Sequence, residues 1–449
     1  MNSKIKKKPS VDFMVLSSFV ARLTRRHPRL QEWLRRVHYY LSSLGAARLP
    51  APLTMEPAKR EHGQVRRILI DATGIQNAQI VRGIQRVAWN QMQALLQYRG
   101  NDIEIIAVIW DLKRGRLLKS RFDNNLPAGK KVRVKSEAIS VEAGDVYFTS
   151  NVYLGCPFGH IQHMRSKGLQ AVFTIYDLIP IRQPGLVPRT NYLAYRDWLR
   201  GVLRVADQLV CISRTVANDL TDWLGNNRQL QSGQIRIDYC YLGVDHISKD
   251  SQDAVGWTQT KLQQASYYIM VGAIEPRKGY QEAISTFDKL WSEGFPYDLV
   301  IVGRLAGLGS QVLPAICSSP FLDRKLRWYE RCDDLMLSSL YQGARCLIAN
   351  SRYEGFGLPV VEAARYGVPV LARDIPVFRE VCGDGAFYFN GDEHDGLYHA
   401  LQAWEGLRGK SMHPLPSSIQ MQTWSENAAR VVATISTAAK SYARVGESS

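Results

Sequence analysis

The sequence lacks the features that mark several large protein classes. Its 449 residues include only seven cysteines, none of them in a CxxC pair, and no cysteine–histidine group has the spacing of a zinc site. This pattern disfavours a disulfide scaffold and indicates a reducing compartment. No apolar run approaches the eighteen or so residues that a transmembrane helix needs.

Three short signatures of nucleotide and metal chemistry are also missing. GxGxxG and GxxxxGK[ST] do not occur, which argues against a dinucleotide-dependent dehydrogenase and a phosphate-loop NTPase. Asp-x-Asp, a carboxylate spacing that often holds a divalent ion, does not occur either. We therefore expect no metal site and no cofactor.

Positive charge is abundant, but most of its excess lies at one end of the chain. The formal net charge is +16, and residues 1–66 hold fourteen Lys or Arg against four Asp or Glu. Such an arm suits an anionic membrane surface or a nucleic acid, and a solvated tail without a partner is an equal alternative. We expect no nucleic acid, because no recognisable RNA or DNA module is present.

The arm also contains a short apolar pattern. In a helix that lies on a surface, these residues would share one face: Phe13, Leu16, Phe19, Val20 and Leu23. The stretch is interrupted by Asp12 and has no convincing cleavage site, so it is a poor signal peptide. We expect a cytoplasmic protein, and contact of the arm with the inner face of the cytoplasmic membrane stays open.

From Arg67 onward, apolar runs of four to eight residues alternate with helix patterns, which predicts parallel sheets covered on both faces. The strands expected in the first half are Ile68–Asp71, Ile103–Trp110, Val146–Phe148, Ala171–Ile175 and Gln208–Ile212. The helices expected there follow Gly83 and run to about Tyr98, lie around Tyr192–Val205, and start at Thr215, with a basic loop at Lys113–Lys135.

The same alternation restarts after a polar stretch at Ser248–Thr260, which we interpret as a linker. The expected strands are Tyr267–Gly272, Asp298–Gly303, Cys346–Ala349 and Val368–Leu371, with helices at Tyr280–Trp291, near Leu335–Gln342 and from Pro359.

These patterns predict an α/β protein with four parts. They are a basic extension (1–66), an N-terminal Rossmann-like domain (67–255), a C-terminal Rossmann-like domain (256–415), and a C-terminal helix (416–449). Two doubly wound domains in tandem bring the switch-point ends of two sheets across one cleft, where a nucleotide is expected to bind.

One segment of the second half combines acids and glycines at the start of a helix. It reads Glu354-Gly-Phe-Gly-Leu-Pro-Val-Val-Glu362. Pro359 suits the first helical position, so we expect Glu362 in the first turn and Glu354 in the loop before it. A carboxylate accepts two hydrogen bonds, which suits a vicinal diol such as ribose or a hexose. Alternatively, Glu362 only complements the helix dipole.

A second segment offers two cations after a strand. Arg277 and Lys278 lie in Glu275-Pro-Arg-Lys-Gly279, between the strand at Tyr267–Gly272 and the next helix. At the carboxyl end of the sheet they would hold a diphosphate and stabilise the charge that builds on it as a glycosidic bond breaks. A solvated surface pair is the alternative.

These two segments resemble those of the retaining glycosyltransferases of family 4, which have the GT-B fold, and most closely its bacterial mannosyltransferase-like members. The spacing from Glu354 to Glu362 matches the E-x7-E signature, and the Arg277-Lys278 run looks like the diphosphate-binding element. Further matches are Leu340-Tyr341, Ser351, Tyr241–Asp245, Val210–Ser213 and Trp424, which opens a last helix that crosses back to the N-terminal domain.

The resemblance implies a role for each matching residue. Glu354 would contact hydroxyls of the donor sugar, and Glu362 would bind the ribose. Phe356 and Gly357 would offer backbone N–H groups to the sugar. Gly83 matches a glycine loop near the phosphates or the acceptor.

One position departs from the family pattern. Histidine often precedes the aspartate that matches Asp177, and here Tyr176 takes its place. A tyrosine near neutral pH is chiefly a neutral hydrogen-bond donor. We assign Asp177 to the reaction together with Glu354, Arg277 and Lys278, although a turn cap before Pro180 is an alternative. Tyr329 would touch the nucleobase or pack in the core.

The resemblance implies transfer of a hexose with retention of configuration, to a glycan or lipid-linked acceptor in surface polysaccharide synthesis. Retention in this family is usually explained by attack from the front face, without a protein nucleophile or a metal ion. Mannose from GDP-mannose is the expected donor, with a UDP-hexose as the alternative. A catalytically inactive binding protein of the same fold is the other possibility that the sequence leaves open.

Overall fold

The computed structural model describes residues 67–76, 83–100, 103–120, 134–153, 155–231, 233–244 and 267–445. The chain divides into two units, 1–57 and 58–449, and every described residue belongs to the second. The basic arm and the linker predicted at Ser248–Thr260 lie outside the described residues. The membrane contact of the arm and the domain boundaries that fall in these segments therefore stay predictions.

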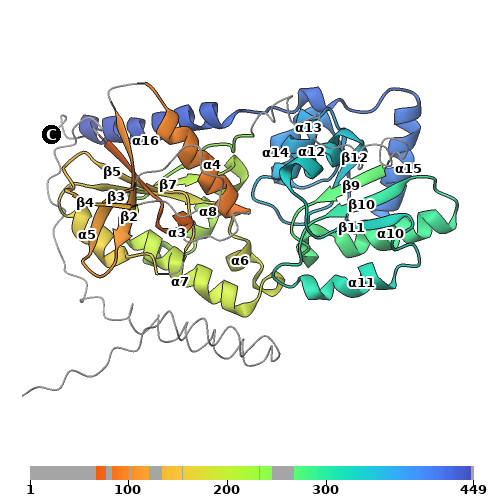
Figure 1. Cartoon of the computed structure of the whole chain (residues 1–449), viewed down its shortest axis with the longest axis horizontal. Helices are drawn as coiled ribbons and strands as arrows, with labels where there is room; N and C mark the ends of the chain where they lie inside the picture. The colour runs from red at the N-terminus through yellow and green to blue at the C-terminus, as the bar shows by residue number, and fades with distance from the viewer. Residues whose placement is uncertain are drawn as a thin grey trace, which may run out of the picture. The chain divides into compact units, whose positions relative to one another are not determined.

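The first sheet has eight strands in the order β4-β3-β2-β1-β5-β6-β7-β8 (Figure 1). Their bounds are β1 Arg67–Asp71, β2 Glu104–Asp111, β3 Arg116–Ser120, β4 Val134–Ile139, β5 Val146–Thr149, β6 Gln170–Ile175, β7 Gln208–Cys211 and β8 Arg236–Tyr239. The helices described with this sheet are α3 Thr73–Gln76, α4 Ile84–Gln97, α5 Phe158–Arg165, α6 Ile179–Arg182, α7 Arg189–Val205 and α8 Arg214–Gly225. Apart from β3 and β4, neighbouring strands are parallel.

The prediction of a basic loop at Lys113–Lys135 was wrong. It contains β3, which pairs antiparallel with β2 and with β4 and so extends the parallel sheet at one edge. Only Leu117 and Ser120 of β3 are buried, and basic residues occupy two of its five positions. β3 lies next to the edge strand β4 and has only two buried positions, so its apolar signal is weak.

The second sheet has six parallel strands in the order β11-β10-β9-β12-β13-β14. Their bounds are β9 Tyr267–Val271, β10 Asp298–Val302, β11 Leu326–Tyr329, β12 Ala344–Ala349, β13 Val370–Arg373 and β14 Ala386–Phe389. The helices of this half are α10 Tyr280–Ser292, α11 Leu313–Ser318, α12 Asp334–Gln342, α13 Leu358–Arg365, α14 Pro376–Cys382 and α15 Gly396–Gly409. This is the order of a doubly wound nucleotide-binding sheet, in which the direction of winding reverses between β9 and β12.

The central strand β9 explains why the second half needs helices on both faces. All of its residues from Tyr267 to Met270 are buried. Tyr268 and Met270 join one core cluster, whereas Tyr267 and Ile269 join a second cluster that extends to Ile68 and its neighbours in the first sheet. Side chains alternate across a strand, so an unbroken apolar run feeds two cores.

The last helix, α16 (Trp424–Val445), packs along α4 of the first half (Figure 1). The contact includes a buried amide pair, because Gln91 Nε2 donates to Asn427 Oδ1 over 3.0 Å. Asn427 also donates to the carbonyl oxygen of Tyr241 over 2.6 Å. The chain therefore returns from the second sheet to the first, as the Trp424 match predicted.

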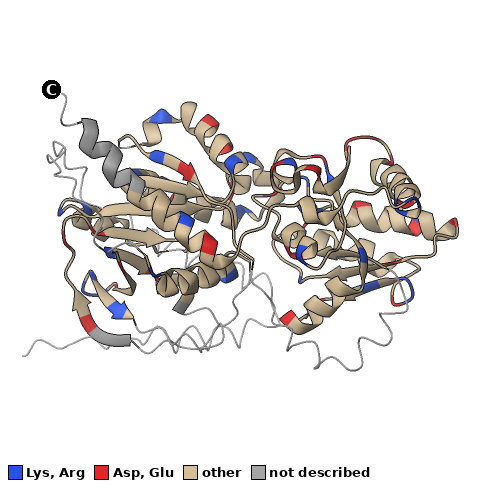
Figure 2. Cartoon of the chain, turned by 90° about the horizontal axis from the view of Figure 1, so that it is seen from above, with Lys and Arg blue, Asp and Glu red and all other residues tan. Residues whose placement is uncertain are grey.

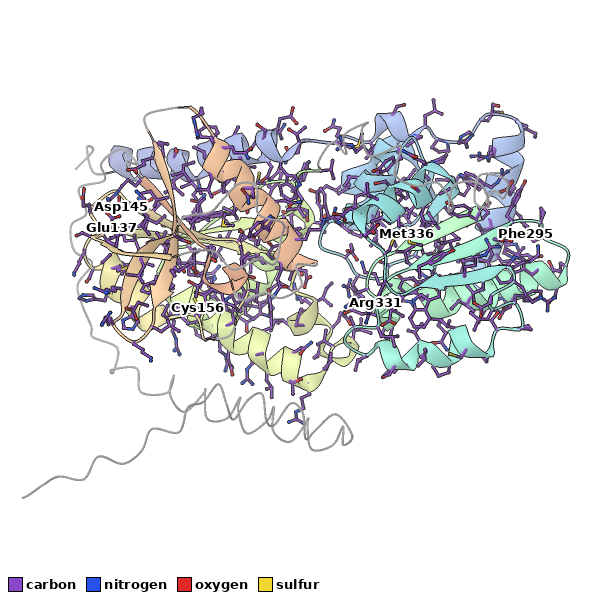
Figure 3. The ribbon with its side chains drawn as sticks, viewed as in Figure 1. Glu137, Asp145, Cys156, Phe295, Arg331 and Met336 are labelled. Carbon is purple, nitrogen blue, oxygen red and sulfur yellow. The ribbon has the colours of Figure 1, made fainter. Side chains whose placement is uncertain are left out.

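Charged side chains of opposite sign are interspersed over the described residues (Figure 2). At the amino ends of β1 and β5, Arg67 binds both carboxylate oxygens of Asp145, at 2.9 and 2.6 Å. Asp145 is labelled in Figure 3. Arg165 pairs in the same way with Asp207, just before β7. Among the described helices, none is both long enough and apolar enough to cross a membrane.

Candidate active site

The predicted site residues of the second half meet at the point where its sheet reverses. β9 is followed by a short 3-10 turn (Pro276–Lys278), and β12 by the loop that contains Glu354. The two strands are parallel neighbours, so their carboxyl ends lie at the same edge of the sheet. A cavity at this edge is lined by Lys278, Glu354 and Gly357, among others.

Glu354 is the centre of an ion-pair cluster. Its Oε2 accepts hydrogen bonds from Lys278 Nζ at 2.7 Å and from Arg277 Nη1 at 3.0 Å. Arg277 also donates to Glu275 Oε2 over 2.7 Å and to the carbonyl oxygen of Tyr353 over 2.9 Å. Two cations and the predicted sugar-binding acid therefore share one location.

The cluster fixes the ionisation of Glu354 and leaves one of its oxygens available. Burial by itself would raise the pKa of Glu354, but the charges of Lys278 and Arg277 outweigh it and lower that pKa below its ordinary value. Both cations bind Oε2, and within the described part of the chain Oε1 accepts no hydrogen bond. An ionised carboxylate oxygen is thus open to a ligand hydroxyl.

Asp177, which follows β6 of the first sheet, belongs to the same electrostatic group. Burial raises its pKa, the charge of Arg277 lowers it in part, and the nearby charges of Glu354 and Glu275 add to the increase. Its Oδ1 also accepts a hydrogen bond from the backbone N–H of Ile179 over 3.0 Å. Asp177 therefore caps a turn and also faces the cluster, so the two predicted readings are compatible.

Loops after the strands of the first sheet contact the glycine-rich loop after β12. Ser213 Oγ, at the end of β7, donates to the carbonyl oxygen of Gly355 over 2.8 Å. A Cβ atom added to Gly355 would lie 2.2 Å from the carbonyl oxygen of Tyr176, so only glycine fits there. The carboxyl ends of the two sheets meet at this loop.

Tyr176, which stands where histidine is often found, does not offer its hydroxyl to the cluster. The side chain is buried, and its Oη donates to the carbonyl oxygen of Ser150 over 2.6 Å. Burial raises the pKa of this hydroxyl further above its usual range. Tyr176 is thus a neutral hydrogen-bond donor within the first sheet.

Glu362 lies in α13, but not in its first turn. The helix begins at Leu358, so Glu362 is its fifth residue; the prediction of a first-turn position was wrong by one residue. The helix begins one residue before Pro359, directly after Gly357, whose backbone is in the left-handed region with φ of 95°. A residue this far from the helix start has little contact with the helix dipole, which weakens the purely structural alternative.

Two residues that the sequence had not assigned hold the carboxylate of Glu362. Tyr341 of α12 donates its hydroxyl to Oε2 over 3.0 Å. Arg86 of α4 lies 3.3 Å from Oε1 and reaches it from the first half of the chain. The Leu340-Tyr341 match to the family did not assign Tyr341 a function, and no local sequence pattern indicated that Arg86 belongs to the site.

The remaining predicted residues are placed less directly. The Phe356 ring is buried and lies 5.9 Å, centre to centre, from that of Tyr241. Gly83 precedes α4 with φ of 53°, beside residues that are not described. Tyr329 ends the edge strand β11, and β10 separates it from the cluster. Its ring packs partly against the core, and the roles assigned to these three residues stay predictions.

A buried arginine supports the turn that presents Lys278. Arg373 of β13 is only 3% exposed, and its Nη2 donates to Asn350 Oδ1 over 2.9 Å and to Glu282. Asn350 in turn donates to the carbonyl oxygen of Gly279 over 2.9 Å. Nothing in the sequence distinguished Arg373 from a surface arginine, because its partners come from α10 and from the residue after β12.

Comparison with known proteins agrees with this location. Residues 257–415 match the family described as Glycosyl transferases group 1. The match contains the whole ion-pair cluster together with Glu362.

Two relatives extend the similarity beyond this domain. The serotype-specific mannosyltransferase WbdA of Escherichia coli is 30% identical over 374 residues, which cover 81% of this chain and 45% of WbdA. The O-antigen chain mannosyltransferase RfbU of Salmonella typhimurium is 27% identical over 234 residues, which cover 52% of this chain and 60% of RfbU. The chain thus spans less than half the length of WbdA.

Solved structures establish the fold. The crystal structure of Anabaena Alr3699/HepE in complex with UDP superimposes with a TM-score of 0.55 at 13% identity, covering 83% of this chain and 100% of the other. Together with the two doubly wound sheets, this gives the chain the GT-B fold, which confirms the fold predicted from its sequence.

Proposed function

We propose that the chain is a retaining, metal-independent glycosyltransferase of family 4 that transfers a hexose from a nucleotide-diphosphate sugar. The observation that carries this proposal is the cluster of Lys278 and Arg277 around Glu354, at the switch point of the second sheet. The group 1 domain and the mannosyltransferase relatives support it.

In this proposal the two cations bind the diphosphate of the donor. As the bond between the sugar C1 and the phosphate oxygen breaks, negative charge grows on the leaving diphosphate. Lys278 and Arg277 stabilise that charge, which is the task of a divalent ion in metal-dependent enzymes. Glu354 keeps both cations in position before the donor binds, and its open Oε1 accepts a hydroxyl of the sugar.

The acceptor hydroxyl attacks C1 from the side on which the diphosphate leaves. The new bond joins C1 to the acceptor oxygen, and the hydroxyl proton passes to the leaving phosphate oxygen, so no protein nucleophile is needed. Asp177 faces the cluster from the first sheet, where it would accept a hydrogen bond from the acceptor or the sugar. Configuration at C1 is retained.

We propose GDP-mannose as the donor and a glycan or lipid-linked glycan of a surface polysaccharide as the acceptor. Support comes from the two relatives, which are mannosyltransferases by name, one of them for the O-antigen chain. The nucleobase would lie beyond β10, towards Tyr329 and the segment that carries Arg331 and leads to Met336 (Figure 3).

The test is a panel of GDP- and UDP-sugars incubated with the full chain and a mannose-terminated oligosaccharide. We expect nucleotide release with GDP-mannose, and an α-linked product by proton NMR, which matches the donor anomer. Turnover of a UDP-hexose instead would overturn the proposed donor but leave the proposed site unchanged. A β-linked product would overturn the retaining mechanism, and binding without turnover of any donor would favour an inactive binding protein.

A further inference from the structure

The ion pair between Arg86 and Glu362 joins the two halves of the molecule. Arg86 is the third residue of α4, a helix of the first half, and Glu362 belongs to α13 of the second. The distance from Arg86 Nη1 to Glu362 Oε1 is 3.3 Å. The Glu362 side chain is 16% exposed and that of Arg86 is 44% exposed. The contact therefore lies at the border between buried protein and solvent.

Both oxygens of the Glu362 carboxylate have a partner, and the partners come from opposite sides. Tyr341 donates to Oε2 from α12, and the Tyr341 ring stacks on Tyr366 at 5.5 Å, which fixes its direction. Arg86 approaches Oε1 from α4. The carboxylate plane is thus held by one neutral donor of the second half and one cation of the first.

The charge state of Glu362 depends on this arginine. Burial raises the pKa of Glu362 above its ordinary value, while the charge of Arg86 and the Tyr341 hydrogen bond lower it in part. Asp334, at the start of α12, raises it further. The charge of Arg86 counteracts the effect of burial on the pKa of Glu362, so removing this charge raises that pKa.

We propose that Arg86 is a positioning residue for the donor ribose: it keeps Glu362 ionised and oriented as a diol acceptor and makes ribose binding depend on contact between the two halves. This inference rests on the proposed function, in which Glu362 binds the ribose. Only an ionised carboxylate accepts hydrogen bonds from both hydroxyls, because a protonated carboxyl gives up part of its acceptor capacity. The expected consequence is a pH-dependent loss of nucleotide affinity.

The sign follows from the direction of the shift. Glu362 accepts the diol above its pKa and loses this ability as the pH falls through it. Removing the Arg86 charge raises that pKa, so a variant without it loses affinity first on the acidic side. For an Arg86→Met variant we expect affinity for GDP to fall about tenfold at pH 6 and less than about threefold at pH 8, since an exposed partner is screened by water.

The experiment is calorimetric titration of the full chain with GDP, UDP and 2′,3′-dideoxy-GDP at pH 6, 7 and 8. The variants are Arg86→Met, the conservative Arg86→Lys, and the control Arg99→Met. Arg99 is exposed just beyond the other end of α4, and within the described residues its guanidinium donates to the carbonyl oxygens of Leu96 and Tyr98. Thermal melting checks that each variant is folded.

The inference predicts that Arg86→Met weakens GDP binding mainly at low pH and hardly changes binding of the dideoxy analogue. Arg86→Lys should restore most of the affinity, and Arg99→Met should match the wild type. An Arg86→Met variant that weakens both ligands equally at every pH, or neither, would overturn the inference. A wild-type chain that binds neither GDP nor UDP would instead overturn the proposed function.

Discussion

Each sheet of this molecule has a point where its winding reverses, and an acidic side chain lies at each point. The two acids differ in whether neutral donors or cations bind them. In the first sheet the reversal lies between β1 and β5, and Asp71 at the end of β1 is 1% exposed. Its carboxylate accepts from the hydroxyls of Tyr147 at 2.5 Å, Tyr153 at 2.7 Å and Thr73 at 2.5 Å, and from the Thr73 N–H. In the second sheet Glu354 instead meets two cations.

The difference shows that strand order alone does not make a diphosphate site. Neutral donors occupy the acid of the first sheet completely, and no cation approaches it among the contacts described. In the second sheet, Glu354 Oε2 binds two cations, whereas its Oε1 accepts no hydrogen bond from the described residues. Glu354 and Lys278 also line a cavity. We therefore assign the donor phosphates to the second sheet and a structural role to Asp71.

The strongest test of this contrast removes a cation from the second sheet. With Lys278→Ala we expect kcat to fall by about 10²–10³, because the leaving diphosphate loses a preorganised positive charge. Steady-state assays of nucleotide release would measure it. The matched control is Lys289→Ala on α10, where the lysine is 46% exposed and pairs with Asp395. Equal losses in both variants would contradict the assignment.

The complementary change removes the charge at the first sheet. Asp71→Asn replaces an acceptor of four hydrogen bonds by an amide whose NH2 group faces hydroxyl donors. We expect the free energy of unfolding to fall by about 2–4 kcal/mol, as for other buried groups that lose partners. Urea denaturation measures the fall, and the folded variant should keep its donor KM. Lost turnover at unchanged stability would make Asp71 part of the reaction.

A smaller effect is expected at the ribose. Tyr341→Phe removes the hydroxyl that binds Glu362 Oε2 but keeps the stacked ring. One neutral hydrogen bond contributes about 0.5–1.5 kcal/mol, so donor KM should rise about 3- to 10-fold with little change in kcat. Initial rates over a range of donor concentrations separate the two constants. A loss confined to kcat would place the hydroxyl in the chemical step instead.

The smallest effect should come from the position that departs from the family. Tyr176→Phe removes a hydrogen bond to the Ser150 carbonyl, within the first sheet. We expect the unfolding free energy to decrease by about 1 kcal/mol and kcat to change less than about threefold. Chemical denaturation and initial rates on one preparation test both. A large drop in kcat with normal stability would mean that this hydroxyl serves the reaction.

The sequence predicted the parts of the site that follow unbroken apolar strands. β9 and β12 are largely buried runs, and the sequence accordingly predicts Arg277 and Lys278 at the carboxyl end of a strand and Glu354 in a loop between a strand and a helix. β3, which lies next to one edge of the first sheet, and β8, which forms the other edge, were not predicted. Both are short and contain polar or charged residues; two residues of β3 are buried and none of β8. Patterns of burial find central strands more readily than edge strands.

The sequence did not predict the side-chain contacts between the two halves. Arg86 and Glu362 are far apart in the sequence, and no motif around either residue indicates that the two form an ion pair. The same holds for Arg373, whose buried side chain binds Glu282 of α10 and Asn350, the residue after β12. Glu362 was assigned to the right helix but the wrong turn, because Pro359 tolerates a start one residue earlier.

The most direct test of the central claim compares the wild type with Glu354→Gln, which keeps the shape of the side chain and removes its charge. Nucleotide release from GDP-mannose and from the UDP-hexoses would be measured with acceptor present, with and without EDTA. The account predicts turnover of one donor by the wild type, unchanged by EDTA, and a loss of at least about 100-fold in folded Glu354→Gln. Full activity of Glu354→Gln, or activity that EDTA abolishes, would contradict it.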